Sequence, residues 1–408
     1  MPGVASCRAV RRCAVGLLAA LIGSVSLTPV RAQDEVRALW VVRTTLTSPT
    51  AVAAMVGAAR TSGFNTLLVQ IRGRADAYYA SGLEPRPLAL AAQPVFDPLA
   101  TTIALAHEAG LQVHAWINVN LVGGVNELPS APDHVIYRHP EWLMVPRALT
   151  GTLADVDPRS PEYLGRLTRY VRAQPTELEG LYLSPMTGGA IDYTSSVVRD
   201  IVERYDVDGV HFDYARYPTD DFDYSREALA AFRHSVTADL TPGEARRADG
   251  RLAEEPLFYT RAYSERWRAF RTARLTALMA RLRQTVKGVK PSALVSAAVA
   301  PDLTEAATRR LQDWRGWLES DLIDIVCPMA YTTDGAAFAS QIAAARQTAG
   351  RHPLWAGIGA YRLSPAQIVE NVRTARRLGV GGIALFSYDT LTAPSRGPDY
   401  LAQLGLWK

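Results

Sequence analysis

The chain has 408 residues, of which 48% are hydrophobic and 21% charged, with 29 glycines and 25 prolines. This is globular composition, and it excludes disordered, collagen-like and disulfide-scaffold proteins. The formal net charge of +4 suggests an anionic partner, but its distribution along the chain points to another explanation.

Residues 1–32 predict a secretory signal peptide. They contain no acid, four arginines, an apolar stretch from Ala14 to about Leu27, and a small-x-small cleavage site at Val30-Arg31-Ala32. The apolar stretch is short for a membrane span. We therefore expect cleavage, a secreted or periplasmic protein, and no integral membrane span in residues 33–408. These residues contain 40 basic and 40 acidic side chains, so the excess charge belongs to the signal.

Two of the three cysteines, Cys7 and Cys13, lie in this peptide. Only Cys327 remains after cleavage, so an intramolecular disulfide is excluded. Cys327 lies in the apolar run Leu322–Ala330, which predicts a core residue rather than a nucleophile.

Short apolar runs after residue 35 alternate with amphipathic stretches. The predicted strands are Val36–Arg43, Asn65–Arg72, Leu111–Asn118, Gly209–Tyr214, Ala293–Ala300, Ile323–Tyr331, Leu354–Ala360 and Gly381–Tyr388. Predicted helices include Pro49–Thr61, Pro98–Ala109, Ser195–Tyr205, Tyr263–Val286 and Pro365–Leu378. Eight strands with intervening helices indicate an α/β fold, a single (β/α)8 TIM barrel over residues 33–408. The strand count by itself is also compatible with a doubly wound sheet.

Two connections are long. Residues 119–206 follow the third strand, and residues 215–258 follow the fourth. Connections of this length in barrels usually carry binding surface.

Alternation along the third and fourth strands predicts which side chains face the barrel interior. His114, Trp116 and Asn118 share the inner face of the third strand. His211 and Asp213 share that of the fourth, with Val210, Phe212 and Tyr214 outside.

Polar and aromatic side chains also mark the ends of other strands. They are Arg72, Tyr331 with Asp334 beyond it, Trp355, Tyr361 and Tyr388. Buried polar groups are costly unless paired, and barrel active sites lie at the carboxyl ends of the strands. A single histidine such as His114 or His211 more often has a core role, whereas Asp213 at a strand end favours catalysis.

The aromatic residues favour a carbohydrate ligand. Trp116, Tyr331, Trp355, Tyr361 and Tyr388 offer flat faces on which sugar rings stack. No Walker loop, dinucleotide fingerprint, zinc spacing or G-x-S-x-G elbow is present, so no cofactor or metal is expected. Export and the lack of a concentrated basic patch disfavour nucleic acid as a partner. No sequence feature indicates an oligomeric state.

The fourth predicted strand lies in a distinctive segment, Asp206-Val207-Asp208-Gly209-Val210-His211-Phe212-Asp213-Tyr214-Ala215-Arg216-Tyr217-Pro218. This segment resembles the glycosyl hydrolase-like ten family. Further pieces match in order, among them Val36–Trp40, His114–Asn118, His139–Trp142, Ile323–Tyr331 and Phe386–Tyr388. The resemblance implies a (β/α)8 barrel and glycoside hydrolysis, for example of peptidoglycan glycan strands. The sequence Met329-Ala330-Tyr331 echoes chitinase-type barrels, but their motif would put a glutamate near Ala215, where none is found.

Glycosidic hydrolysis usually needs two carboxyl groups. We expect Asp213 to be the first and Asp334 or Asp302 the second; Asp389, Asp76 and Glu141 are further possibilities. Substrate-binding roles are expected for Arg72, His114, Trp116, Asn118, His211, Tyr331, Trp355, Tyr361 and Tyr388. The alternative is a non-catalytic extracytoplasmic barrel that binds a glycan.

Overall fold

The computed structural model describes residue 3, residues 35–397 and residues 399–407, and Glu35–Lys408 form one compact unit. The predicted signal peptide and its cleavage site, with Cys7 and Cys13, lie outside the described residues.

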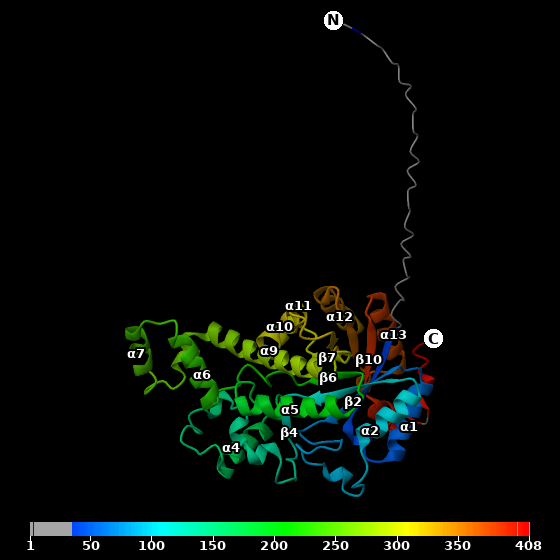
Figure 1. The fold of residues 1–408 in the computed structure, drawn as a ribbon, viewed down its shortest axis with the longest axis horizontal. Helices are drawn as coiled ribbons and strands as arrows, with labels where there is room; N and C mark the ends of the chain where they lie inside the picture. Colours follow the sequence, from blue (N-terminus) through cyan, green and yellow to red (C-terminus); the bar gives the residue numbers. More distant parts are fainter. Residues whose placement is uncertain (1–2, 4–34, 398, 408) are drawn as a thin grey trace. The chain divides into compact units, whose positions relative to one another are not determined.

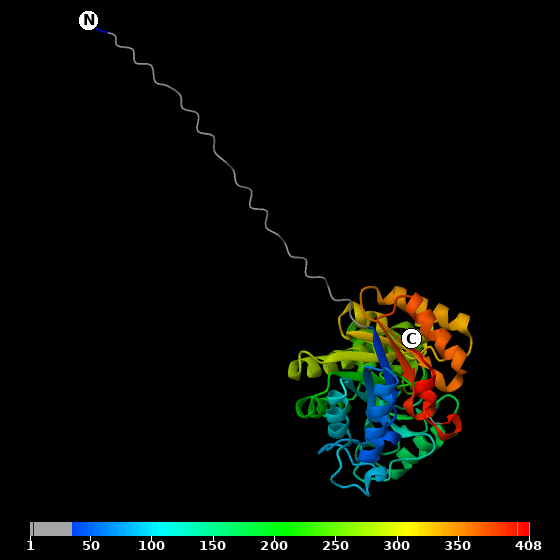
Figure 2. The same cartoon turned by 90° about the vertical axis from the view of Figure 1, so that its right-hand side faces the viewer.

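Eight parallel strands alternate with helices and form a nearly closed barrel. They are β1 (Val36–Val41), β2 (Thr66–Arg72), β3 (Gln112–Asn118), β6 (Gly209–Asp213), β7 (Leu294–Val299), β8 (Ile325–Pro328), β9 (Trp355–Gly359) and β10 (Gly382–Phe386). Their order is β8-β7-β6-β3-β2-β1-β10-β9, and Figure 2 shows the first strand beside the last. Two parallel bridges, Val326–Leu354 and Met329–Gly357, join the remaining edges. The predicted TIM barrel is thereby confirmed, with slightly shorter strands.

The predicted helices cover the outside of this barrel. The longer ones are α1 (Pro49–Thr61), α2 (Pro98–Glu108), α5 (Gly188–Arg204), α9 (Ser264–Val289), α12 (Gly335–Ala349) and α13 (Pro365–Arg377). Three of them begin at proline behind a capping side chain, Ser48, Asp97 or Ser364, whose oxygen accepts a backbone N–H. Short helices are α10 (Leu303–Thr308), α11 (Trp314–Glu319), α14 (Tyr388–Leu391) and α15 (Tyr400–Gln403).

Helix α5 starts seven residues before its predicted beginning. Its first turn contains Gly188 and Gly189, which disfavour a helix from sequence alone. A Cβ at Gly189 would lie 2.4 Å from the Trp142 ring. Packing against Trp142 therefore explains the glycine and overrides the local preference.

The two long connections carry additional elements. After β3 come α3 (Val135–Arg138), α4 (Pro161–Arg172) and an antiparallel pair, β4 (Leu121–Gly124) with β5 (Gly180–Tyr182). After β6 come α6 (Arg226–Thr237), α7 (Pro242–Gly250) and α8 (Phe258–Ala262). Figure 1 shows α6, α7 and one end of α9 extending beyond the barrel. The sequence predicted none of β4, β5, α6 and α7.

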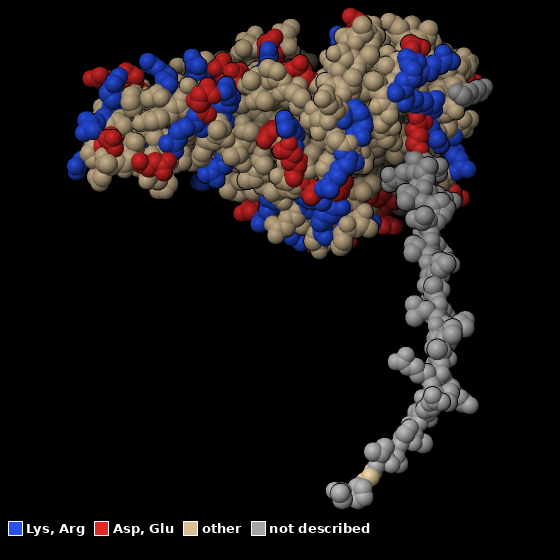
Figure 3. All heavy atoms as spheres, turned by 90° about the horizontal axis from the view of Figure 1, so that it is seen from above, with Lys and Arg blue, Asp and Glu red and all other residues tan. Residues whose placement is uncertain are grey.

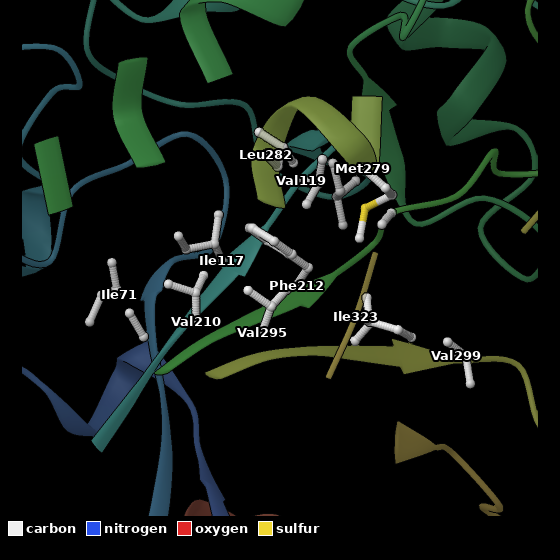
Figure 4. Close-up of a cluster of buried hydrophobic side chains, with 14 of the residues drawn as sticks. Ile71, Ile117, Val119, Val210, Phe212, Met279, Leu282, Val295, Val299 and Ile323 are labelled. Carbon is white, nitrogen blue, oxygen red and sulfur yellow. The ribbon is translucent and has the colours of Figure 1, made fainter. Parts of the chain in front are cut away.

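Hydrophobic side chains form one layer outside the strands and another inside. Outside, Val210 and Phe212 pack in the same cluster as Met279 and Leu282 of α9, as Figure 4 shows. The inner cluster includes Trp40, Trp116, Cys327 and Trp355, all buried. The predicted outward orientation is confirmed for Val210 and Phe212, which pack in the outer cluster, and so is the core role of Cys327, which is fully buried.

Charges of both signs are interspersed over the face shown in Figure 3. No helix among the described residues has the length and apolar character needed to cross a membrane.

Candidate active site

A pocket of about 240 Å³ lies at the carboxyl ends of the strands. Seven of the eight barrel strands, all except β9, contribute lining residues themselves or through the residues that directly follow them. The lining residues are Trp40, Val42, Arg43, Gln70, Arg74, Trp116, Asp213, Tyr214, Arg216, Ala298, Met329, Tyr331 and Phe386. The pocket is therefore where a barrel enzyme would carry its reacting groups.

Asp213, the last residue of β6, is the carboxylic acid that lines this pocket. It is buried, and burial raises its pKa to about 6, against the opposing effects of Arg216, of the Tyr214 N–H and of Trp116. The Tyr214 N–H donates to Asp213 Oδ1 at 2.6 Å. A carboxyl with this pKa is partly protonated near neutral pH, as general-acid catalysis requires.

Glu179 is a second carboxyl whose charge acts on Asp213, although its side chain does not line the pocket. Its Oε1 accepts a hydrogen bond from Arg216 Nη2 at 2.8 Å, and its Oε2 accepts one from the Tyr182 hydroxyl at 2.7 Å. Burial raises the pKa of Glu179, but Arg216 and Tyr182 outweigh burial and hold this pKa below its usual value. The Glu179 charge in turn raises the pKa of Asp213. Two neighbouring carboxyls are thus driven toward opposite protonation states.

No sequence pattern singles out Glu179. It directly precedes β5, inside the connection of residues 119–206, and the β4–β5 pairing brings it back to the barrel. The length of that connection was the only sequence signal, and length does not select one glutamate.

Aromatic rings form much of the wall of the pocket. Tyr331 contacts Phe386 with ring centroids 5.6 Å apart, and Trp40 stands edge-on to Tyr331 at 6.4 Å. Trp116 meets Phe386 at 6.2 Å. Such rings present apolar faces of the kind that pack against the C–H faces of sugars. Trp116 and Tyr331 thus line the pocket, as the sequence analysis expected of binding residues.

The two inner histidines lie below the pocket and do not line it. His211 Nε2 accepts a hydrogen bond from Trp40 Nε1 at 3.1 Å, so its Nδ1 carries the proton and donates to Ser296 Oγ at 2.9 Å. Burial, aided by His114, lowers the pKa of His211 to about 3. Burial likewise lowers the pKa of His114 to about 4. Both rings are neutral, and His211 positions Trp40.

Arg72 and Asn118 support the pocket from behind. Arg72 is fully buried, and its Nε donates to Glu84 Oε1 at 2.7 Å while its Nη1 donates to the Asn118 carbonyl. Asn118 Nδ2 donates to the Gly73 carbonyl at 2.8 Å. Neither side chain lines the pocket; both join the loops that follow β2 and β3.

The remaining predicted binding residues are dispersed. Trp355 is buried inside the barrel next to His114, at 5.4 Å between ring centroids. Tyr361 is exposed at the rim, with its ring 6.2 Å from that of Tyr331. Tyr388 is half-buried in α14. The structure brings none of these three into the lining of the pocket.

Asp302 and Asp334, the expected second carboxylates, are helix caps. Asp302 Oδ1 accepts the Glu305 N–H at the start of α10, and Asp334 Oδ1 accepts the Ala336 and Ala337 N–H groups at the start of α12. Neither lines the pocket with Asp213. A strand followed closely by a helix requires a cap at this point, and the sequence analysis gave these positions a catalytic interpretation instead.

The predicted outward orientation of Tyr214 is wrong. Tyr214 adopts a left-handed backbone conformation (φ 51°), which breaks the strand alternation, and its side chain lines the pocket. Its ring lies 4.7 Å from the Arg216 guanidinium carbon and 6.0 Å from that of Arg74. Arg74 and Arg216 are further lining residues that the sequence analysis did not select.

A larger cleft of about 460 Å³ adjoins the pocket. Arg43 and Arg74 line both spaces, and Glu179 lines the cleft. Its other walls come from the loop after β2, including the exposed Leu88, and from the loop after β4, including Glu127. The two spaces together could accommodate several units of a chain-like ligand.

Among the residues that the structure describes, no group of three or more His, Cys, Asp or Glu side chains could hold a metal ion. The chemical groups that the pocket itself offers to a ligand are its carboxyl group, its arginines and its aromatic rings.

Proteins with similar sequences are named as glycosyl hydrolases. Over 300 residues the chain is 24% identical to glycosyl hydrolase YngK of Bacillus subtilis (strain 168), covering 67% of this chain and 47% of that protein. It is 25% identical, also over 300 residues, to glycosyl hydrolase DigH of Escherichia coli (strain K12), covering 66% of this chain and 55% of that protein. The chain thus spans about half the length of these relatives.

Solved structures share the fold at low sequence identity. The glycoside hydrolase domain of PgaB (BpsB) from Bordetella bronchiseptica has a TM-score of 0.62 and 17% identity, covering 91% of this chain and 98% of that chain. The catalytic domain of β-amylase from Paenibacillus polymyxa has a TM-score of 0.58 and 11% identity, covering 92% and 98%.

The family described as glycosyl hydrolase-like 10 matches residues 35–359, which include β1 to β9 and every carboxyl group discussed above except Asp389. The chain therefore belongs to the glycosyl hydrolase-like 10 family.

Proposed function

We propose that this chain hydrolyses O-glycosidic bonds of a glycan, with Asp213 as the general acid. The observation that carries the proposal is the buried Asp213 carboxyl at a strand end, with its pKa raised to about 6 in an aromatic pocket. The related glycosyl hydrolases and the adjoining cleft support a polymeric carbohydrate substrate.

In the proposed reaction Asp213 donates its proton to the glycosidic oxygen as the C–O bond breaks. The positive charge that develops on the sugar ring is stabilised by ionised Glu179. Water then attacks the anomeric carbon, leaves its hydroxyl group there, and returns its other proton to the Asp213 carboxylate, which regenerates the acid. Arg216 keeps Glu179 ionised through their ion pair, so that only Asp213 gains a proton near neutral pH.

The substrate class that we propose includes peptidoglycan glycan strands without stem peptides. We also propose that the protein acts outside the cytoplasm, because residues 1–32 have the pattern of a signal peptide. This location would bring the enzyme to cell-wall glycans.

The test is turnover of defined peptidoglycan glycan oligosaccharides, followed by product analysis. Asp213→Asn should lower kcat by about 100-fold or more, because a positioned general acid contributes about 10²–10⁴-fold. Glu179→Gln should lower kcat and also lower the melting temperature, because it leaves the buried Arg216 without its counter-ion, so turnover is compared at a temperature at which the variant is fully folded. The control is Asp192→Asn, an exposed carboxylate on α5 paired with Arg281, which should retain full turnover. Undiminished hydrolysis by Asp213→Asn would remove Asp213 from the mechanism.

A second candidate function is non-catalytic glycan binding. Glu179 is hydrogen-bonded to Arg216 and Tyr182, so Asp213 is the carboxyl that lines the pocket. A pocket lined by one carboxyl favours binding, because hydrolysis usually needs two. Saturable binding without product over prolonged incubation would support this alternative over hydrolysis.

A further inference from the structure

Arg74 lies where the cleft joins the pocket. It lines both spaces, and a chain that occupied the cleft and reached Asp213 would pass its guanidinium group. The position is thus suited to contact a substituent of the substrate close to the bond that is cleaved.

The charge of Arg74 is unmatched, in contrast to its two neighbours. Arg43 pairs with Asp76 at 3.6 Å, and Arg216 pairs with Glu179 at 2.8 Å. Within residues 35–397 and 399–407, Arg74 has no carboxylate at ion-pair distance, and Nη1 donates only to the neighbouring Gly73 carbonyl at 2.8 Å. Burial lowers the pKa of Arg74, as expected for a guanidinium that lacks a counter-ion.

The backbone of Arg74 is held in place before any ligand arrives. Its N–H donates to Asp76 Oδ1 at 2.7 Å, and its carbonyl accepts a hydrogen bond from His134 Nε2 at 2.6 Å. The ring of Tyr214 lies 6.0 Å from the Arg74 guanidinium carbon and 4.7 Å from that of Arg216. Because the backbone is held, the side chain starts from a defined position, which lowers the entropy lost when it binds an anion.

We infer that Arg74 binds a carboxylate carried by the substrate, and that the preferred glycan is therefore acidic. A guanidinium offers two parallel N–H groups to a carboxylate, which gives orientation as well as affinity. The inference deepens the proposed function, and it rests on that function only in placing the substrate across the pocket.

The experiment measures binding by calorimetry in the full-length Asp213→Asn background, so that hydrolysis does not enter. The probes are two matched pairs: peptide-free peptidoglycan oligosaccharides and oligogalacturonates, each with its carboxyl-reduced counterpart. In at least one pair, reduction should weaken the affinity by about 10- to 100-fold, the usual effect of a hydrogen bond to a charged group.

Adding Arg74→Gln should abolish the difference between the acidic and reduced forms, and Arg74→Lys should restore part of it. The control is Arg351→Gln, an exposed arginine 3.9 Å from Asp321, which should leave the preference unchanged. Equal affinity for the acidic and reduced forms in both pairs, a preference that survives Arg74→Gln, or binding to none of the probes would overturn the inference. If the protein binds the acidic forms with the expected preference but the wild type shows no turnover, the proposed hydrolysis is wrong and the role of Arg74 in binding stands.

Discussion

At the scale of single residues, the site depends on how the surroundings of two carboxyls differ. Asp213 is buried among aromatic side chains, whereas Glu179 is bonded to Arg216 and Tyr182. Burial disfavours the charged form of Asp213, and the ion pair favours the charged form of Glu179. Identical functional groups therefore reach different protonation states at one pH.

This difference predicts the pH dependence of activity. The general acid must be protonated, so kcat/KM should fall as the pH rises through about 6, the pKa of Asp213. The measurement is a pH profile on a glycan that does not itself titrate between pH 4 and 9. A profile flat from pH 5 to 8 would contradict the assignment.

The same pKa has a consequence for stability, which serves as an independent readout. The pKa of Asp213 is raised on folding, so the folded state binds more protons than the unfolded state between the unfolded and folded pKa values. The stability contributed by protonated Asp213 is therefore lost as the pH rises through about 6. Asp213→Asn should raise the melting temperature at pH 7.5, and this gain should shrink at pH 4.

At the scale of elements, buried polar contacts hold the loops that surround the site. Arg72 at the end of β2 bonds Glu84 in the following loop, and Glu84 also accepts from the Tyr193 hydroxyl of α5 at 2.8 Å. Arg72 Nη1 also bonds the carbonyl of Asn118 at the end of β3. One buried side chain thus links two strand ends and a loop.

Arg72→Met should destabilise the fold by about 3–5 kcal/mol, because it leaves the Glu84 carboxylate buried without its partner. The double variant Arg72→Met with Glu84→Gln should recover part of this loss. Denaturant unfolding measures both. The control is Arg315→Met, which removes an exposed pair with Glu319 and should change little. Unchanged stability combined with weaker glycan binding would instead support the substrate-binding role predicted from the sequence.

At the scale of the whole molecule, the barrel is closed between β8 and β9 by two isolated bridges rather than a continuous ladder. Gly357 of β9 lies at this seam. A Cβ there would be 2.7 Å from the Pro328 carbonyl and 3.2 Å from the Trp40 ring. The glycine permits the close approach of β8 and β9 and, through Trp40, affects the floor of the pocket.

Gly357→Ala should therefore lower the free energy of unfolding by about 1–3 kcal/mol, the usual cost of overpacking. Because Trp40 lines the pocket, glycan binding should weaken as well. Gly57→Ala in α1 is the matched control, since a Cβ there meets nothing within 4 Å and alanine favours a helix. Equal melting temperatures for wild type and Gly357→Ala would contradict this prediction and would show that β8 and β9 move apart to accept the added methyl group without cost.

Local sequence patterns were enough to predict eight strands alternating with helices, the inner positions of Trp116 and Asp213, and the core role of Cys327, because strand alternation and strand–helix periodicity are properties of short segments. The choice of a barrel over a doubly wound sheet came from the family resemblance. Only the tertiary structure shows which polar residues lie together in the pocket. There Asp302 and Asp334 cap helices, Arg72 joins Glu84, and Tyr214 turns into the pocket through a left-handed backbone. Glu179 reaches Arg216, which lines the pocket, through a β4–β5 pair that no local pattern predicts. These outcomes depend on contacts between segments far apart in the chain, and periodicity carries no information about such contacts.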